Sequence, residues 1–177
     1  MQRSTMQDAI SAPKVGGIVR LTKFILRGTF LIEALGAVLL FPVFCRDFGI
    51  KRIWMSVFHS ISAFCNAGFD ILGTTDHTFV SLTGYSRNIW LNIVIMLLII
   101  LGGIGFLTWE DFYTNKFKFK RYRMQSKVIL ITTAILIIAP AVFFFACDFG
   151  NLPAGKRLLA SVFQSVTTRT AGFNTED

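Results

Sequence analysis

The chain has 177 residues, of which 53% are hydrophobic and 16% are charged, and its mean hydropathy is +0.59. Soluble globular domains carry about 25% charged residues, so this composition excludes an ordinary soluble domain and indicates a membrane protein. The 19 phenylalanines exclude a disordered or collagen-like chain, because such chains lack bulky apolar groups. The net charge of +8 does not indicate a nucleic-acid partner, since the basic residues mainly flank apolar segments.

Two uncharged stretches predict transmembrane helices. Residues 88–109 and residues 128–147 contain no charged side chain. A helix needs about 20 apolar residues, at about 1.5 Å each, to cross the roughly 30 Å of hydrocarbon in a bilayer. Both stretches meet this length, and we expect each of them to form one transmembrane helix.

A third span is predicted over residues 28–45, before the other two in the chain. It extends back to about residue 19, because the long side chains of Lys23 and Arg27 can reach the aqueous interface. This span contains Glu33, and an ionisable side chain within the membrane is costly. We expect Glu33 to face the protein interior or a wet crevice, either as a buried partner of an arginine or backbone amide, or close to ions.

The basic residues indicate the orientation of these spans. They gather before the first span and between the second and third, and cytoplasmic loops of membrane proteins are enriched in lysine and arginine. We therefore predict a multi-pass protein of the cell (plasma) membrane with a cytoplasmic N-terminus. The basic residues placed inside are Arg3, Lys14, Arg20, Lys23, Arg27, Lys116, Lys118, Lys120, Arg121, Arg123 and Lys127.

Two further apolar segments are too short to cross a bilayer. Residues 53–64 follow the first span and residues 158–168 follow the third, and each has about 12 residues. We interpret both as re-entrant half-helices. The first leads into Cys65, Asn66, Ala67, Gly68 and Phe69, and the second leads into Arg169, Thr170, Ala171, Gly172, Phe173 and Asn174.

The sequence contains an internal repeat of about 104 residues. The triplet at residues 56–58 recurs at 161–163, and the triplet at 67–69 recurs at 171–173. Two copies in like topology argue against each Ala-Gly-Phe being a simple turn. The fold class predicted is therefore an all-α integral membrane protein built from a repeated unit of transmembrane helix, re-entrant pore half-helix with a glycine loop, and transmembrane helix.

This repeat divides the chain into four segments. Residues 1–18 form a cytoplasmic N-terminal segment, and residues 19–109 form one complete unit. Residues 110–126 form a basic cytoplasmic loop. Residues 127–177 form a second unit that stops after its glycine loop, before a closing helix.

The glycine loops are candidate cation sites. Irregular backbone is tolerated at membrane depth only where protein or a water-filled pathway satisfies its polar groups. Gly68 and Gly172 can adopt dihedrals closed to other residues and turn loop carbonyls toward a common axis, where carbonyl oxygens replace the water shell of a cation. The half-helices aim their partially negative C-terminal ends into the membrane, which favours cations. The candidate pathway residues are Cys65, Asn66, Ala67, Gly68, Phe69, Thr170, Ala171, Gly172 and Phe173.

Three segments carry a specific pattern: F-H-S-I-S-A-F-C-N-A-G-F at 58–69, L-I-I-L-G-G-I-G-F at 98–106 and F-Q-S-V-T-T-R-T-A-G-F-N at 163–174. They closely resemble the Trk/Ktr/HKT superfamily of cation transporters, particularly the bacterial Ktr-type membrane subunit. The resemblance implies four non-identical helix, pore-loop, helix units around a potassium or sodium pathway, with one filter glycine per unit. This chain is similar to the second unit and the start of the third, so Gly68 and Gly172 would be two of the four filter glycines, with K⁺ passing their carbonyls.

The same resemblance implies partners and a cargo. The membrane subunit would form a homodimer in the lipid bilayer and meet a cytosolic nucleotide-binding regulatory subunit. The transported ion would be K⁺ or Na⁺, and no covalently bound cofactor is expected. The basic loop from Lys116 to Lys127 would contact either that regulatory subunit or anionic lipid. The family more often has asparagine where this chain has Cys65, and a thiol there is either a packing choice or a target for thiol reagents.

Several other residues have less specific interpretations. His59 and His77 lack companions at metal-ligand spacing, so we expect His59 to face protein and His77 to lie in an outer loop. We expect Arg169 to point into surrounding protein and pair with a carboxylate. Three glycines near the inner end of the second span favour close helix contact rather than a hinge. These are Gly102, Gly103 and Gly105.

Cation transport is the main functional hypothesis, and no catalytic constellation indicates an enzyme. The alternative is a membrane-embedded accessory or scaffold protein whose re-entrant loops bind lipid or another subunit without transport. A tetrameric potassium channel fits less well, because the loops are non-identical and no T-V-G-Y-G occurs. Two loops do not close a ring of four, so we predict that this chain is a fragment of a longer subunit and is not a functional pore by itself.

Overall fold

The computed structural model describes residues 18–47, 49–73, 80–116, 118–148 and 153–175. Every regular element within these ranges is a helix, which confirms the predicted all-α class. The six α-helices are α2 (Ile18–Asp47), α3 (Arg52–Phe64), α4 (Ile89–Gly103), α5 (Phe106–Asn115), α6 (Met124–Cys147) and α7 (Ala154–Arg169). Short 3-10 turns lie at η2 (Gly49–Lys51), η3 (Thr83–Tyr85) and η4 (Phe119–Arg121).

Two of these helices are long and apolar enough to cross a membrane. They are α2, over Val19–Cys45, and α6, over Met124–Cys147. α2 supports the predicted extension of the first span back to about residue 19. α6 begins four residues before the predicted uncharged stretch, because its first turn includes the polar and basic residues that precede that stretch.

The second predicted span is not one helix, so the prediction over residues 88–109 is wrong in this respect. α4 ends at Gly103, and the chain turns by 96° into α5. Gly105 has φ +80°, a backbone conformation that residues with a Cβ rarely adopt, and it forms the corner. The indole N–H of Trp109 donates to the carbonyl oxygen of Leu101 at 3.1 Å, which satisfies a carbonyl left free at the helix end.

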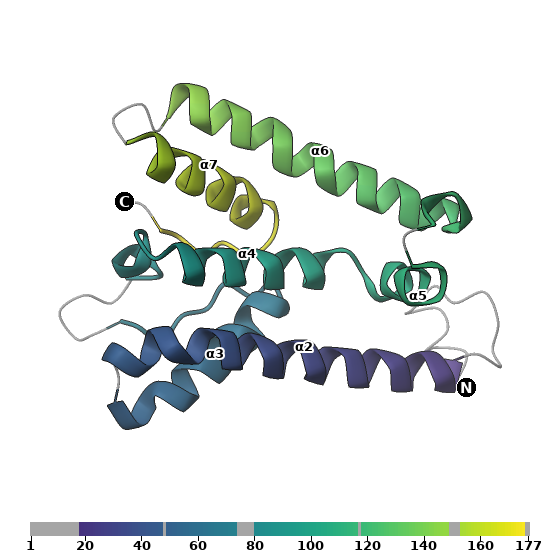
Figure 1. Ribbon diagram of the computed structural model, residues 1–177, viewed down its shortest axis with the longest axis horizontal. Helices are drawn as coiled ribbons and strands as arrows, with labels where there is room; N and C mark the ends of the chain where they lie inside the picture. Colours follow the sequence, from purple (N-terminus) through teal and green to yellow (C-terminus); the bar gives the residue numbers. More distant parts are fainter. Residues whose placement is uncertain (1–17, 48, 74–79, 117, 149–152, 176–177) are drawn as a thin grey trace.

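The helices form two similar pairs on either side of α4 (Figure 1). α2, α4 and α6 run lengthwise through the molecule, while the shorter α3 and α7 start at the same end of it. α3 packs on α2 and α4, and α7 packs on α6 and α4. The two short helices therefore point the same way, as the repeat predicts for two units in like topology.

The core is centred on one face of α4. Leu91, Ile95 and Ile99 are fully buried and lie four residues apart, so they stack along this face. They belong to the same apolar cluster as Phe44 of α2 and Phe163 of α7. By contrast, Ser126 is the one residue of α6 that is buried within the described chain, and the outward apolar side chains of this helix suit lipid.

Matching hydrogen bonds join each short helix to the long helix before it. The hydroxyl of Ser60 donates to the carbonyl oxygen of Glu33 at 2.7 Å. The hydroxyl of Ser165 donates to the carbonyl oxygen of Ile137 at 2.6 Å. These two pairs are related by the offsets of the sequence repeat, so the duplication extends to individual contacts.

The corner between α5 and α6 is held by a buried carboxylate. Asp111 is 4% exposed, and it accepts from the hydroxyl of Ser126 at 2.6 Å and from the backbone N–H of Arg123 at 2.9 Å. The guanidinium of Arg123 also lies 2.7 Å from the carboxylate of Glu110. These contacts place α5 against the start of α6 and restrain the basic segment between them.

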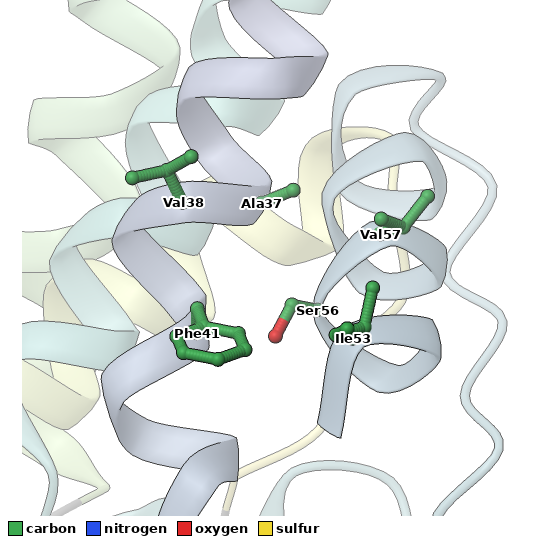
Figure 2. A pocket seen from close by; sticks show the side chains of 6 residues that line it. All are labelled: Ala37, Val38, Phe41, Ile53, Ser56 and Val57. Carbon is green, nitrogen blue, oxygen red and sulfur yellow. The ribbon is translucent and has the colours of Figure 1, made fainter. Parts of the chain in front are cut away.

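Figure 2 shows a small cavity between α2 and α3. It measures about 220 Å³, and its walls are apolar apart from the hydroxyl of Ser56. That hydroxyl already donates to the carbonyl oxygen of Arg52 at 2.8 Å, so this cavity is a packing gap without a free polar group. Its lining residues are Ala37, Val38, Phe41, Ile53, Ser56 and Val57.

A substitution at Gly36 tests how closely α2 packs against α3 and α4. A Cβ at this position would meet the Ser60 hydroxyl and both terminal methyl groups of Leu98, whereas a Cβ at Gly155, also helical, meets nothing within 4 Å. We expect Gly36→Ala to lower the free energy of unfolding by about 1–3 kcal/mol relative to Gly155→Ala. Thermal unfolding in detergent measures this difference, and equal melting temperatures would contradict the packing.

Candidate ion pathway

The first loop, residues 65–69, leaves the end of α3. Its shape depends on Ser62, which holds it at two points. The backbone carbonyl of Ser62 accepts from the N–H of Ala67 at 2.9 Å, and its hydroxyl donates to the carbonyl oxygen of Phe69 at 2.7 Å. Gly68, between these points, has φ +69°, so the turn needs a residue without a Cβ.

The second loop, residues 170–173, leaves the end of α7 and is held in the same way. The backbone carbonyl of Thr167 accepts from the N–H groups of Ala171 and Gly172, each at 3.0 Å. The hydroxyl of Thr167 donates to the carbonyl oxygen of Phe173 at 2.8 Å. Gly172 has φ +81°. Ser62 and Thr167 are therefore equivalent clamps in the two units.

The loop carbonyls between the clamped points are the candidate ion ligands. Among the described residues, no hydrogen bond ends on the carbonyl oxygens of residues 65–68 or 170–172. Four of these residues, Cys65, Ala67, Thr170 and Gly172, are exposed in this chain. These oxygens are therefore free to replace the water shell of a cation, which is the chemistry of a carbonyl-lined filter.

The two loops touch at equivalent positions. The hydroxyl of Thr170 donates to the side-chain oxygen of Asn66 at 2.9 Å, across 104 residues of sequence. A Cβ added at Gly68 would overlap the carbonyl oxygen of Ala171. The structure thus brings the nine predicted pathway residues into two adjoining loops. Their two phenylalanines differ, since Phe69 is 70% exposed and Phe173 is 1% exposed.

The end of α4 packs against the ends of α3 and α7, from which the two loops leave. A Cβ at Gly102 would overlap the carbonyl oxygen of Phe64, and a Cβ at Gly103 would press on the guanidinium of Arg169. The prediction of close helix contact is therefore correct for these two glycines. For Gly105 it is wrong, because that residue makes the bend and meets nothing within 4 Å.

Arg169 does point into protein, but the predicted carboxylate partner is not found within the described part of the chain. Its Nη2 atom is buried without a hydrogen-bond acceptor there. The guanidinium lies beside Gly103, the last residue of α4, and Arg169 itself ends α7. Helix C-termini carry partial negative charge, so they provide the electrostatic complement that a carboxylate was expected to give.

The structure also places two ionisable residues of the sequence analysis, Glu33 and His59. Glu33 is half-buried, and its Oε1 lies 4.0 Å from the thiol of Cys65, so it faces the first loop. His59 is fully buried, with Nδ1 2.8 Å from the carbonyl oxygen of Met55 and its ring against Phe44, which confirms that it faces protein. His77 lies outside the described residues.

The sequence did not reveal the hydrogen bonds that hold the far end of the second loop. The N–H of Asn174 donates to the hydroxyl of Ser81 at 2.9 Å, and its carbonyl oxygen accepts from the N–H of Leu82 at 2.9 Å. Leu82 is fully buried. The segment before α4 therefore supports the loop after α7, and its sequence signal is a leucine between two polar residues, Ser81 and Thr83.

The family model described as cation transport protein, TrkH, matches residues 1–177. The chain belongs to this family. It is 38% identical to the potassium/sodium uptake protein NtpJ of Enterococcus hirae over 99% of this chain and 39% of that protein. It is 33% identical to the Ktr system potassium uptake protein B of Bacillus subtilis over 99% of this chain and 40% of that protein.

Membership has two direct consequences. The cation transport protein family is one of membrane transport proteins and not of enzymes, which agrees with the membrane-capable helices described above. The chain spans about two fifths of the length of these relatives.

The clamp at Thr167 can be tested by comparing the stability of a Thr167 variant with that of a Thr168 variant. Thr167→Val leaves the carbonyl of Phe173 without its donor, and we expect a loss of about 1–3 kcal/mol in unfolding free energy. Thr168→Val removes an exposed hydroxyl that bonds only within α7, to Gln164, and should change stability by about 0.5 kcal/mol or less. Denaturant unfolding in detergent compares the two, and equal losses would contradict the clamp.

Proposed function

We propose that the chain forms part of a potassium, or sodium, pathway across the cell membrane, with backbone carbonyls of the first and second loops as ion ligands. The observation that carries this proposal is the pair of equivalent loops in which the carbonyls of residues 65–68 and 170–172 accept no hydrogen bond from the described residues. The names of the relatives, which are potassium and potassium/sodium uptake proteins, support the choice of cation. Cys65–Phe69 and Thr170–Phe173 are the proposed pathway residues.

The surrounding electrostatics support a cation in preference to an anion. α3 and α7 both end at these loops, so the partially negative ends of two helices meet there. Glu33 adds a carboxylate beside the first loop. Arg169 lies under the second loop, where its charge is set against the end of α4. A hydrated cation entering between the loops would exchange water for carbonyl oxygens and move down its electrochemical gradient.

The wider assembly is also a proposal. Three relatives are named as proteins of Ktr systems. We propose that this chain is part of a membrane subunit that forms a homodimer and binds a cytosolic nucleotide-binding regulatory subunit. The positions of the basic residues support a cytoplasmic N-terminus. The end of the molecule that carries α5 and the start of α6 would then face the cytoplasm.

Growth of a potassium-uptake-deficient bacterium on limiting potassium tests the function. The chain is expressed alone and with the natural flanking sequence of its gene. We expect growth from the extended version only, abolished by Gly68→Asp or Gly172→Asp and kept by Gly84→Asp, whose site is open.

Either unexpected result is informative. Growth from the 177 residues alone would show that two loops assemble a pore by association. Absence of growth from a well-expressed extended version would favour the accessory or scaffold function.

Binding of the ion can also be measured without transport. A ligand that binds only the folded state at 100 times its dissociation constant stabilises that state by about 2.7 kcal/mol. We expect K⁺ to raise the melting temperature of the protein made from its complete gene, relative to a large organic cation at equal ionic strength. Gly172→Asp should remove the difference, and a melting temperature independent of K⁺ would contradict ion binding by the loops.

A further inference from the structure

Two adjoining cavities lie along the first half of α2, near the end of the molecule where α5 lies (Figure 1). One measures about 710 Å³ and is walled mainly by aliphatic and aromatic side chains of α2, α4, α5 and α6, together with Lys116 and Tyr122. The other measures about 790 Å³ and lies against the first turns of α2. Phe24, Leu31 and Tyr113 line both, and we call the pair the inner groove. Each volume is typical of a small-molecule site, about 300–1,000 Å³.

The wider part of the inner groove is basic. Arg20, Lys23 and Arg27 line it, and their spacing places them on one face of α2. All three are exposed, and none forms an ion pair with a carboxylate in the described part of the chain. Three like charges on one helix face repel one another, so this surface favours an anionic occupant.

The apolar part of the inner groove contains an unsatisfied hydroxyl. Thr108 is 2% exposed and lines this cavity, yet its Oγ1 has no hydrogen-bond partner among the described residues. A buried hydroxyl without a partner is unfavourable, and native structures normally supply one. Trp109 and Tyr113 lie on the same wall, and such side chains are enriched where apolar and polar regions of a bilayer meet.

We propose that the inner groove binds one anionic glycerophospholipid. Its phosphate would lie against Arg20, Lys23 and Arg27, and one acyl chain would fill the apolar cavity. Its ester oxygens would supply the acceptor that Thr108 lacks. A free phosphate or nucleotide matches the basic part alone, because the adjoining cavity is lined mainly by aliphatic and aromatic side chains. This site is separate from the loops and does not depend on the proposed function.

Native mass spectrometry tests headgroup selection. The protein made from its complete gene is purified in detergent and mixed with equal amounts of phosphatidylglycerol and phosphatidylcholine. We expect saturable retention of one phosphatidylglycerol per chain. Lys23→Gln with Arg27→Gln should weaken it roughly 25-fold, since each basic residue near a membrane surface contributes about fivefold. The control, Lys51→Gln with Lys156→Gln, removes two exposed charges outside the groove and should leave retention unchanged.

The apolar part of the inner groove is tested by substitutions that change its shape or polarity. Leu130→Trp should fill the cavity and lower retention without changing charge, and Thr108→Val should weaken binding about fivefold by removing the hydroxyl donor. Size-exclusion elution checks that each variant remains folded. Equal retention of the two lipids would overturn the proposal. So would equal losses in the control variant, or displacement of the lipid by inorganic phosphate.

Discussion

A backbone carbonyl in hydrocarbon needs a donor, because no water is present to supply one. The helices of this protein meet that need internally, and the exceptional segments are two short loops that follow α3 and α7. Ser62 and Thr167 each provide a hydroxyl and a carbonyl that fix the ends of a loop. The intervening carbonyls accept no hydrogen bond from the part of the chain that the structure describes. The packing of α3 and α7 on longer helices serves to hold these loops in place.

Much of the architecture could be predicted from the sequence. The apolar lengths of α2 and α6 are visible as hydropathy, and the shared triplets at 56–58 and 161–163 identify the duplication. The bend after α4 could not be predicted, because residues 88–109 are uniformly uncharged and hydropathy contains no information about φ at Gly105. Nothing in the sequence distinguished that glycine from Gly102 and Gly103, which pack closely.

The candidate site was predictable in position but not in detail. The glycines indicated where the backbone would turn, while the clamps depend on side-chain contacts across six and seven residues that no periodic pattern identifies. The setting of Arg169 was missed for another reason. A buried guanidinium suggests a carboxylate, whereas the partial charge at a helix end is spread over backbone carbonyls and leaves no residue type to recognise.

The two units share backbone geometry but not chemistry. Asn66 and Thr170 occupy equivalent positions, as do Cys65 and Arg169, and Glu33 of α2 corresponds to Ile137 of α6. In an assembly of identical subunits, one codon change alters every wall of a shared site at once. Here each wall has its own codons. Selection can therefore change one loop without changing the other. A damaging substitution then alters a single position of the site.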